Sequence, residues 1–118
     1  MVNTRISVLI ADDSDRKTER VKSVIFESLK DRAGIEVMTT TSVADAMQLL
    51  SVHDFDLLVL DLFLPLKPGA TADRQGGVRL LTEIQRYARL RPPSYIVGLT
   101  AHRELESKYS EYFDSDGW

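Results

Sequence analysis

Four polar side chains stand where short apolar runs of the sequence end, and together they could do phosphoryl chemistry. Asp12 and Asp13 follow the first run, Asp61 interrupts a second, and Thr100 follows a third. An acidic residue within an apolar run is costly to bury without a partner. No Lys or Arg adjoins these carboxylates in the sequence, so we expect a hard divalent cation such as Mg²⁺ to offset their charge. A carboxylate beside Mg²⁺ can attack phosphorus, and the Thr100 hydroxyl could hydrogen-bond a phosphoryl oxygen.

The elements that must position these residues follow from an alternation of apolar runs with helical periods. Short apolar runs predict strands at 6–10, 35–38, 55–60 and 95–99. Apolar residues at helical spacing predict amphipathic helices from Asp15 to near Gly34, after a cap at 40–42, around 78–87 and around 105–113. This order predicts an α/β fold, a doubly wound parallel sheet with helices on both faces. Functional groups in such sheets collect at the carboxyl ends of the strands.

Composition restricts the class of protein. The chain has 118 residues, no cysteine, a formal net charge of −3, 43% apolar and 28% charged residues. This balance indicates one globular domain and excludes a disulfide scaffold, a thiolate zinc site and a thiol nucleophile. The mild negative charge gives no reason to expect binding to nucleic acid or to an anionic membrane. No window approaches the ~20 apolar residues of a membrane span, and we expect a cytoplasmic protein.

Three segments of the sequence resemble the receiver domain of two-component response regulators. They are LIADD at 9–13, LVLDLFLP at 58–65 and VGLTA at 97–101, each at the end of a predicted strand and in the family's order. The resemblance covers nearly the whole chain. It implies the flavodoxin-like strand order 2-1-3-4-5.

The resemblance also implies roles for individual residues. Asp61 would be the phosphoacceptor, and Thr100 would be the switch hydroxyl that reports the phosphoryl group. The ligands of Mg²⁺ would be Asp12, Asp13, Asp61 and the backbone carbonyl of Phe63. The partners implied are a histidine kinase or phosphotransfer protein and an output domain or effector outside this chain. The resemblance also allows a second copy as partner in a homodimer. Such a domain assists its own phosphorylation and is not a turnover enzyme.

The sequence departs from the family pattern in two places. An insertion of roughly eight residues lies within the segment 66–75, after Pro65. It is either a tolerated surface loop or a lid over Asp61. The second departure is in the C-terminal part of the family pattern. Residues 1–118 are expected to form a receiver that lacks the fifth strand, the fifth helix and the family's lysine. Trp118 would then align with the switch aromatic of the family.

Several alternatives stay open at this point. Asp12 and Asp13 could form only a turn, with Ser14 or Asp15 as the helix cap, and Thr100 could be an ordinary residue at a strand end. The alternative function is a degenerate receiver that binds partners without phosphorylation. An aspartyl phosphohydrolase is disfavoured, because that chemistry needs a second Asp two residues after the nucleophile and position 63 is Phe.

Overall fold

The structure, a computed structural model, describes residues 5–29 and 34–99. Within these ranges strands and helices alternate as the sequence predicts. The elements are β1 (Arg5–Ala11), α1 (Asp15–Leu29), β2 (Gly34–Thr40), α2 (Val43–Leu50), β3 (Leu57–Asp61), α3 (Gly76–Arg86) and β4 (Tyr95–Leu99). The helix predicted around 105–113, Thr100 and Trp118 lie outside the described residues.

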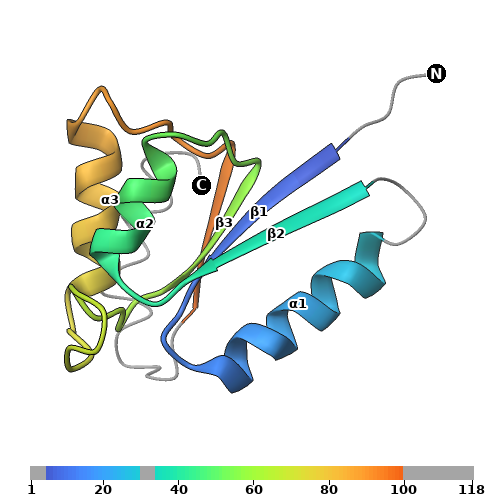
Figure 1. Cartoon of the computed structure of the whole chain (residues 1–118), viewed down its shortest axis with the longest axis horizontal. Coiled ribbons are helices and arrows are strands. Elements are labelled where there is room, and N and C mark those ends of the chain that lie inside the picture. The colour runs from blue at the N-terminus through green and yellow to red at the C-terminus, as the bar shows by residue number, and fades with distance from the viewer. Residues whose placement is uncertain (1–4, 30–33, 100–118) are drawn as a thin grey trace.

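The four strands form one parallel sheet in the order β2-β1-β3-β4 (Figure 1). This confirms the doubly wound fold and the part of the predicted strand order that the described residues cover. The register pairs Ala11 with Leu60, the last apolar residues of their strands. Asp12 and Asp61 each come one residue later, so the sheet itself brings these two carboxylates side by side.

Helices cover both faces of the sheet: α1 lies on one face, and α2 and α3 lie together on the other (Figure 1). Alternate residues of the strands supply two separate cores. Leu58 and Leu60 of β3 belong to the core beneath α2 and α3, whereas Val59, between them, belongs to the core beneath α1. The end of β3 is therefore packed on both faces of the sheet.

Serine side chains cap the N-termini of the first two helices. The Ser14 Oγ accepts a hydrogen bond from the Lys17 N–H at 3.2 Å, and the Ser42 Oγ accepts one from the Asp45 N–H at 3.1 Å. Both are capping contacts, which satisfy N–H groups that have no partner within the helix. Of the candidates at 40–42, Ser42 is the cap of α2.

The loop after β3 is anchored to the helices of the same face. The carbonyls of Pro65 and Leu66 accept hydrogen bonds from the first two N–H groups of α2, at 2.8 and 3.0 Å. Helix α3 begins at Gly76, two residues earlier than its apolar period suggests. A Cβ at Gly76 would lie 1.8 Å from the Leu64 carbonyl oxygen, so only glycine allows α3 to pack this closely.

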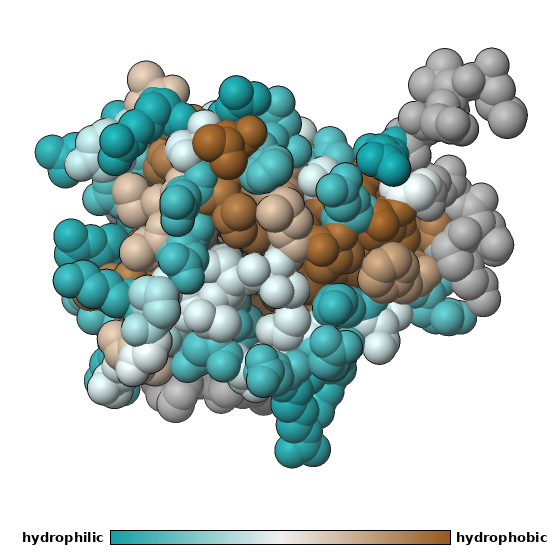
Figure 2. Space-filling view, in the orientation of Figure 1, coloured by the Kyte–Doolittle hydropathy of each residue, from teal (hydrophilic) through white to brown (hydrophobic). Residues whose placement is uncertain are grey.

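The surface is mixed in polarity. Apolar surface runs across the middle of one face, near the edge strand β2 and beside α1, with polar side chains on both sides of it (Figure 2). In the part of the chain that the structure describes, no helix is long and apolar enough to cross a membrane.

Candidate functional site

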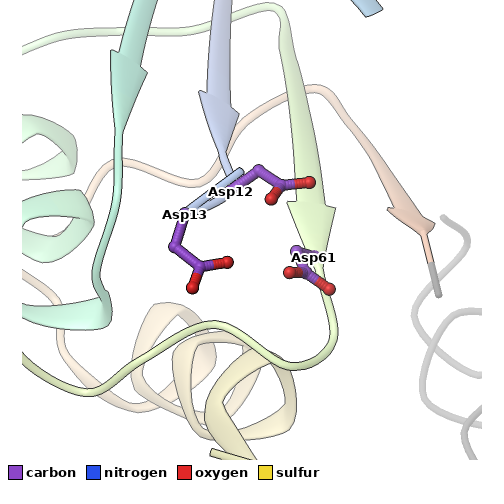
Figure 3. A group of neighbouring side chains, drawn as sticks. All are labelled: Asp12, Asp13 and Asp61. Atoms are coloured by element: carbon purple, nitrogen blue, oxygen red, sulfur yellow. The ribbon is translucent and has the colours of Figure 1, made fainter. Parts of the chain in front are cut away.

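Three carboxylates meet at the carboxyl ends of β1 and β3 (Figure 3). Asp12, Asp13 and Asp61 each offer one oxygen, and these atoms all lie within 4.8 Å of one another. Asp12 and Asp61 are each 4% exposed, whereas Asp13 is exposed. The predicted convergence is confirmed for these three residues, which we call the acidic pocket.

The backbone holds the two buried carboxylates in the same way. The Asp12 Oδ1 accepts a hydrogen bond from the Ser14 N–H at 2.9 Å, and the Asp61 Oδ1 accepts one from the Phe63 N–H at 3.0 Å. In each case the donor is two residues further along the chain, which is the pattern of an Asx turn. Asp12 thus belongs to a turn before a serine-capped helix and also lines the pocket, so those two interpretations do not exclude each other.

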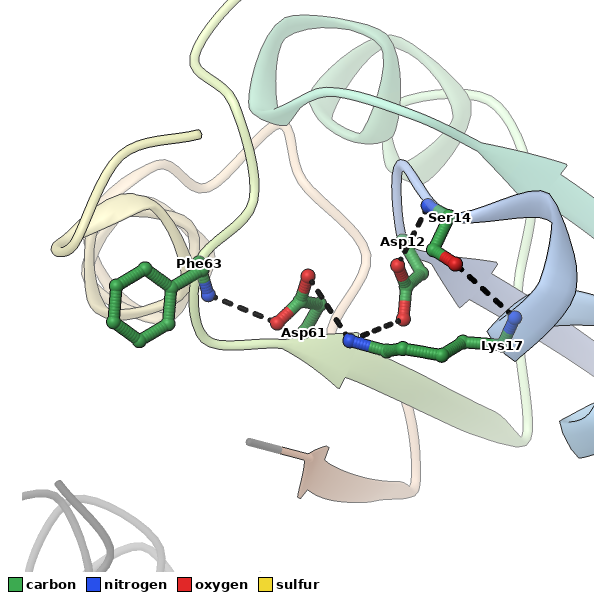
Figure 4. Close-up of polar contacts among 5 residues, drawn as sticks. All are labelled: Asp12, Ser14, Lys17, Asp61 and Phe63. Atoms are coloured by element: carbon green, nitrogen blue, oxygen red, sulfur yellow. Dashed lines mark hydrogen bonds and ion pairs between the residues drawn. The ribbon is translucent and has the colours of Figure 1, made fainter. Parts of the chain in front are cut away.

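A lysine that was not among the predicted site residues lies in the pocket. The Lys17 Nζ is 3.2 Å from the Asp12 Oδ2 and 3.5 Å from the Asp61 Oδ2 (Figure 4). No Lys or Arg adjoins the carboxylates in the sequence, but the fold brings the ammonium of Lys17 to them. Lys17 is the third residue of α1, and that first turn brings its side chain back to the strand ends.

One signal in the sequence could have indicated Lys17. A positive charge in the first turn of a helix is unfavourable, because the helix dipole is positive there. A lysine at that position, four residues after an Asp pair at a strand end, suggests that the carboxylates compensate for it.

The charges in the pocket perturb one another. Burial raises the pKa of Asp61, and the charges of Asp12 and Asp13 act in the same direction, against the Phe63 N–H and Lys17. Burial alone would lower the pKa of Lys17, but the charges of Asp61 and Asp12 outweigh it and the pKa is raised. Three carboxylates and one ammonium leave the pocket negative when all are ionised.

The pocket fits a hard divalent cation. The buried Oδ2 of Asp12 accepts no hydrogen bond among the described residues, although Lys17 contacts it as an ion pair. An oxygen that is buried and unsatisfied in this way is a favourable ligand for a cation. Carboxylate oxygens are the ligands that Mg²⁺ prefers, usually one or two together with water.

The insertion at 66–75 forms an exposed loop beside this end of the sheet. It turns at Gly69, whose φ is 76°, and the Ala70 N–H donates a hydrogen bond to the Lys67 carbonyl at 3.1 Å. Residues 67–72 are exposed. The described hydrogen bonds of this loop run within it, to α2 and to the first turn of α3. Its function as a lid over Asp61 stays a prediction.

A doubly wound parallel sheet in the order β2-β1-β3-β4, with a pocket at its carboxyl edge, has the flavodoxin-like architecture. The family model of the response regulator receiver domain matches residues 8–115 of the chain. The chain therefore belongs to the response regulator receiver family, whose members are phosphoacceptor domains of two-component signalling.

A curated relative is the uncharacterized protein y4jS of Sinorhizobium fredii, which is 33% identical over 111 residues. The match covers 94% of this chain and 26% of y4jS, so the chain spans about a quarter of the length of that relative.

Solved structures of similar fold include a sensor protein from Polaromonas sp. JS666, with 25% identity, a TM-score of 0.64, and coverage of 92% of this chain and 76% of that one. A CheY-like receiver domain from Methylobacillus flagellatus has 21% identity and a TM-score of 0.62, covering 86% and 74%. The response regulator TrrA from Thermotoga maritima, solved with Mg²⁺ and BeF, has 22% identity and a TM-score of 0.57, covering 91% and 79%. These likenesses confirm the receiver fold.

Proposed function

We propose that the domain accepts a phosphoryl group on Asp61, with Mg²⁺ held in the acidic pocket. The observation that carries this proposal is the meeting of Asp12, Asp13 and Asp61 within 4.8 Å, with Asp61 buried at the end of a central strand. The ligands would be these three carboxylates and the backbone carbonyl of Phe63. Bound there, Mg²⁺ would offset the negative charge of the transferring phosphoryl group.

The two oxygens of Asp61 have different contacts. Its Oδ1 accepts a hydrogen bond from the Phe63 N–H at 3.0 Å, and its Oδ2 contacts the Lys17 ammonium. In the proposed reaction a bond forms between one oxygen of the Asp61 carboxylate and phosphorus while the phosphorus–nitrogen bond of a phosphohistidine breaks. The histidine nitrogen keeps the electron pair and takes up a proton.

Burial contributes to this reactivity. Asp61 is 4% exposed, so its carboxylate has little water to lose before it attacks. The Phe63 N–H keeps the side chain in one orientation, so the carboxylate faces the pocket. Thr100 is proposed as the hydroxyl that senses the product, and Trp118 as the switch aromatic.

The phosphodonor would be a histidine kinase or a phosphotransfer protein, and the response would pass to an output domain or effector outside residues 1–118. A homodimer and a cytoplasmic location also remain predictions. No turnover of a separate substrate is needed for any of these roles, because the domain itself is the substrate.

Phosphorylation of the 118-residue chain by phosphoramidate with Mg²⁺ tests the proposal, with intact mass as the readout. We expect one phosphoryl group to be added, and Asp61→Asn to abolish the addition. Asp54→Asn is the matched control, since Asp54 is exposed and pairs with Arg91 at 3.0 Å, away from the pocket.

The result that would overturn the proposal is a chain that stays unmodified although it is folded and Mg²⁺ is present. Phosphorylation that persists in Asp61→Asn would overturn the assignment of the acceptor. The first result would favour the alternative, a degenerate receiver that binds partners without phosphorylation.

A further inference from the structure

The Lys17 ammonium bridges the two buried carboxylates of the acidic pocket. Its Nζ contacts the Oδ2 of Asp12 at 3.2 Å and the Oδ2 of Asp61 at 3.5 Å (Figure 4). Counted for the side chains alone, Asp12 and Asp61 are 3% and 5% exposed, whereas the lysine side chain is 34% exposed. The lysine thus reaches a buried pair from the solvent side and can withdraw without leaving the surface of the protein.

The ammonium contacts the oxygens that a metal ion would use. The Oδ1 atoms of Asp12 and Asp61 are already occupied by the N–H groups of Ser14 and Phe63, at 2.9 and 3.0 Å. The Oδ2 atoms are left to bind a cation, and Lys17 contacts both of them. A divalent ion and the ammonium at the same oxygens would repel each other strongly at such short range.

Among the described residues, the Lys17 ammonium is held by these two contacts. Lys17 lies in the first turn of α1, where the helix dipole disfavours a positive charge. Its stem is a flexible chain of four carbons, and a partly exposed ammonium regains water readily when it leaves. At 3.2 and 3.5 Å both contacts are longer than a strong charge-assisted hydrogen bond, so they are easier to break.

We propose that Lys17 is a tethered cation that competes with Mg²⁺ for the acidic pocket. Without metal, its ammonium neutralises Asp12 and Asp61 and keeps them together. Binding of Mg²⁺ displaces the ammonium from both Oδ2 atoms, so Lys17 sets the Mg²⁺ concentration at which the domain can be phosphorylated. This inference rests on the proposed function, because it concerns the same metal site.

The competition predicts opposite effects of one substitution. Lys17→Met keeps most of the apolar stem and removes the charge. Without metal, two buried carboxylates then lose their shared counter-charge, and we expect a lower melting temperature. With Mg²⁺ the competitor is gone, and we expect the dissociation constant for Mg²⁺ to fall about tenfold, typical of losing one close charge.

A titration of Mg²⁺ into chelator-treated protein, followed by the amide NMR signals of Asp13, Ser14 and Phe63, measures this constant at fixed ionic strength. Lys22→Met is the matched control. Lys22 is on the same helix and equally exposed, at 33%, but pairs with Glu19 at 3.5 Å. Its substitution should leave the affinity for Mg²⁺ unchanged, which separates local competition from the loss of one positive charge.

The wild-type chain supplies a second measurement, which does not depend on whether Lys17→Met folds. The NMR signals of the Lys17 side-chain Cε and ammonium should shift on addition of Mg²⁺, because the ammonium leaves the carboxylates, and those of Lys22 should stay.

Two outcomes would overturn the inference and are distinguishable. If the wild-type chain binds Mg²⁺ while Lys17→Met binds no more tightly and the Lys17 signals do not move, the competition is wrong and the proposed function stands. If neither chain binds Mg²⁺ at the pocket, the metal-dependent function fails together with the inference.

Discussion

The face of the sheet covered by α2 and α3 and the face covered by α1 use alternate residues of the same strands but differ in depth of packing. Five of the eleven residues of α3 are buried. Only Thr18 and Ile25 are buried among the fifteen residues of α1. Within the described residues, Val24 and Phe26 of α1 are exposed apolar side chains, at 61% and 43%.

The difference in packing indicates that the two faces of the sheet contribute differently to the site. The α2–α3 face fixes the frame, because fully buried leucines and the anchored loop hold the end of β3 where Asp61 lies. The α1 face is packed less deeply and supplies Lys17, whose side chain is 34% exposed. A firmly packed acceptor strand beside a counter-ion on a less deeply packed helix suits the competition with Mg²⁺ proposed above.

The largest expected effect compares equal truncations on the two faces. Leu80→Ala on α3 and Ile25→Ala on α1 each remove the same number of carbon atoms. Leu80 is 0% exposed and Ile25 is 9% exposed. We expect losses in the free energy of unfolding of about 3–4 kcal/mol for Leu80→Ala and about 2 kcal/mol for Ile25→Ala. Urea unfolding measures both, and equal losses would remove the distinction between the faces.

A second comparison adds one methyl group to each side of the molecule. A Cβ at Gly76 would lie 1.8 Å from the Leu64 carbonyl oxygen, whereas one at Gly34 would meet the Arg5 side chain at an ordinary 3.8 Å. Gly76→Ala should therefore displace α3 and cost about 3 kcal/mol. Gly34→Ala should be nearly neutral. A tolerated Gly76→Ala in thermal unfolding would show that the packed face can shift.

The helix caps offer a finer test. Ser42 caps α2 and is fully buried, whereas Ser14 caps α1 and is partly exposed. We expect Ser42→Ala to cost about 1.5 kcal/mol and Ser14→Ala about 0.7 kcal/mol, because water can replace the lost contact only at Ser14. The free energies of unfolding of the two variants test this expectation. A larger loss for Ser14→Ala than for Ser42→Ala would contradict the greater rigidity of the α2–α3 face.

The smallest effect concerns the charge of Asp61 without metal. Its folded-state pKa lies above 3.8, so the unfolded chain loses this proton at lower pH than the folded chain does. The ionised carboxylate therefore destabilises the fold, fully above the folded-state pKa and not at all below 3.8. Asp61→Asn should raise the melting temperature by a few degrees at neutral pH in chelator, and the gain should shrink as the pH falls toward 3.8.

Asp54→Asn is again the control, since Asp54 is exposed and should give little change. A loss of stability in Asp61→Asn at neutral pH would mean that the ion pair with Lys17 outweighs the burial of the carboxylate.

Much of the fold was predictable because its signals are local. The apolar run at 95–99 coincides with β4, and the predicted start of the first helix at Asp15 is that of α1. The predicted end of that helix near Gly34 falls instead on the first residue of β2. Ser42 was among the predicted caps, because its residue type and its place before a helical period define that position. The strand order came from the resemblance to receiver domains and not from the residues alone.

The start of α3 illustrates the limit of local signals. Two glycines are poor helix formers, so the loop was predicted to run through Gly76 and Gly77. In the structure both lie within α3. A Cβ at Gly76 would meet the backbone of Leu64, and one at Gly77 would meet the backbone of Leu62, so glycine at both positions lets α3 pack against the segment after β3. Contact with a distant segment outweighed the intrinsic preference of the residue.

The sequence by itself determined the residue types of the site: carboxylates at two strand ends, with the turns that hold them. Only the tertiary structure decided that Asp12 and Asp61 are buried together, with the Lys17 ammonium shared between them. The physical reason is that residue type and period act within one element, whereas burial and charge pairing depend on distances between elements. Those distances are set by the register of β1 with β3 and by the packing of α1 on the sheet.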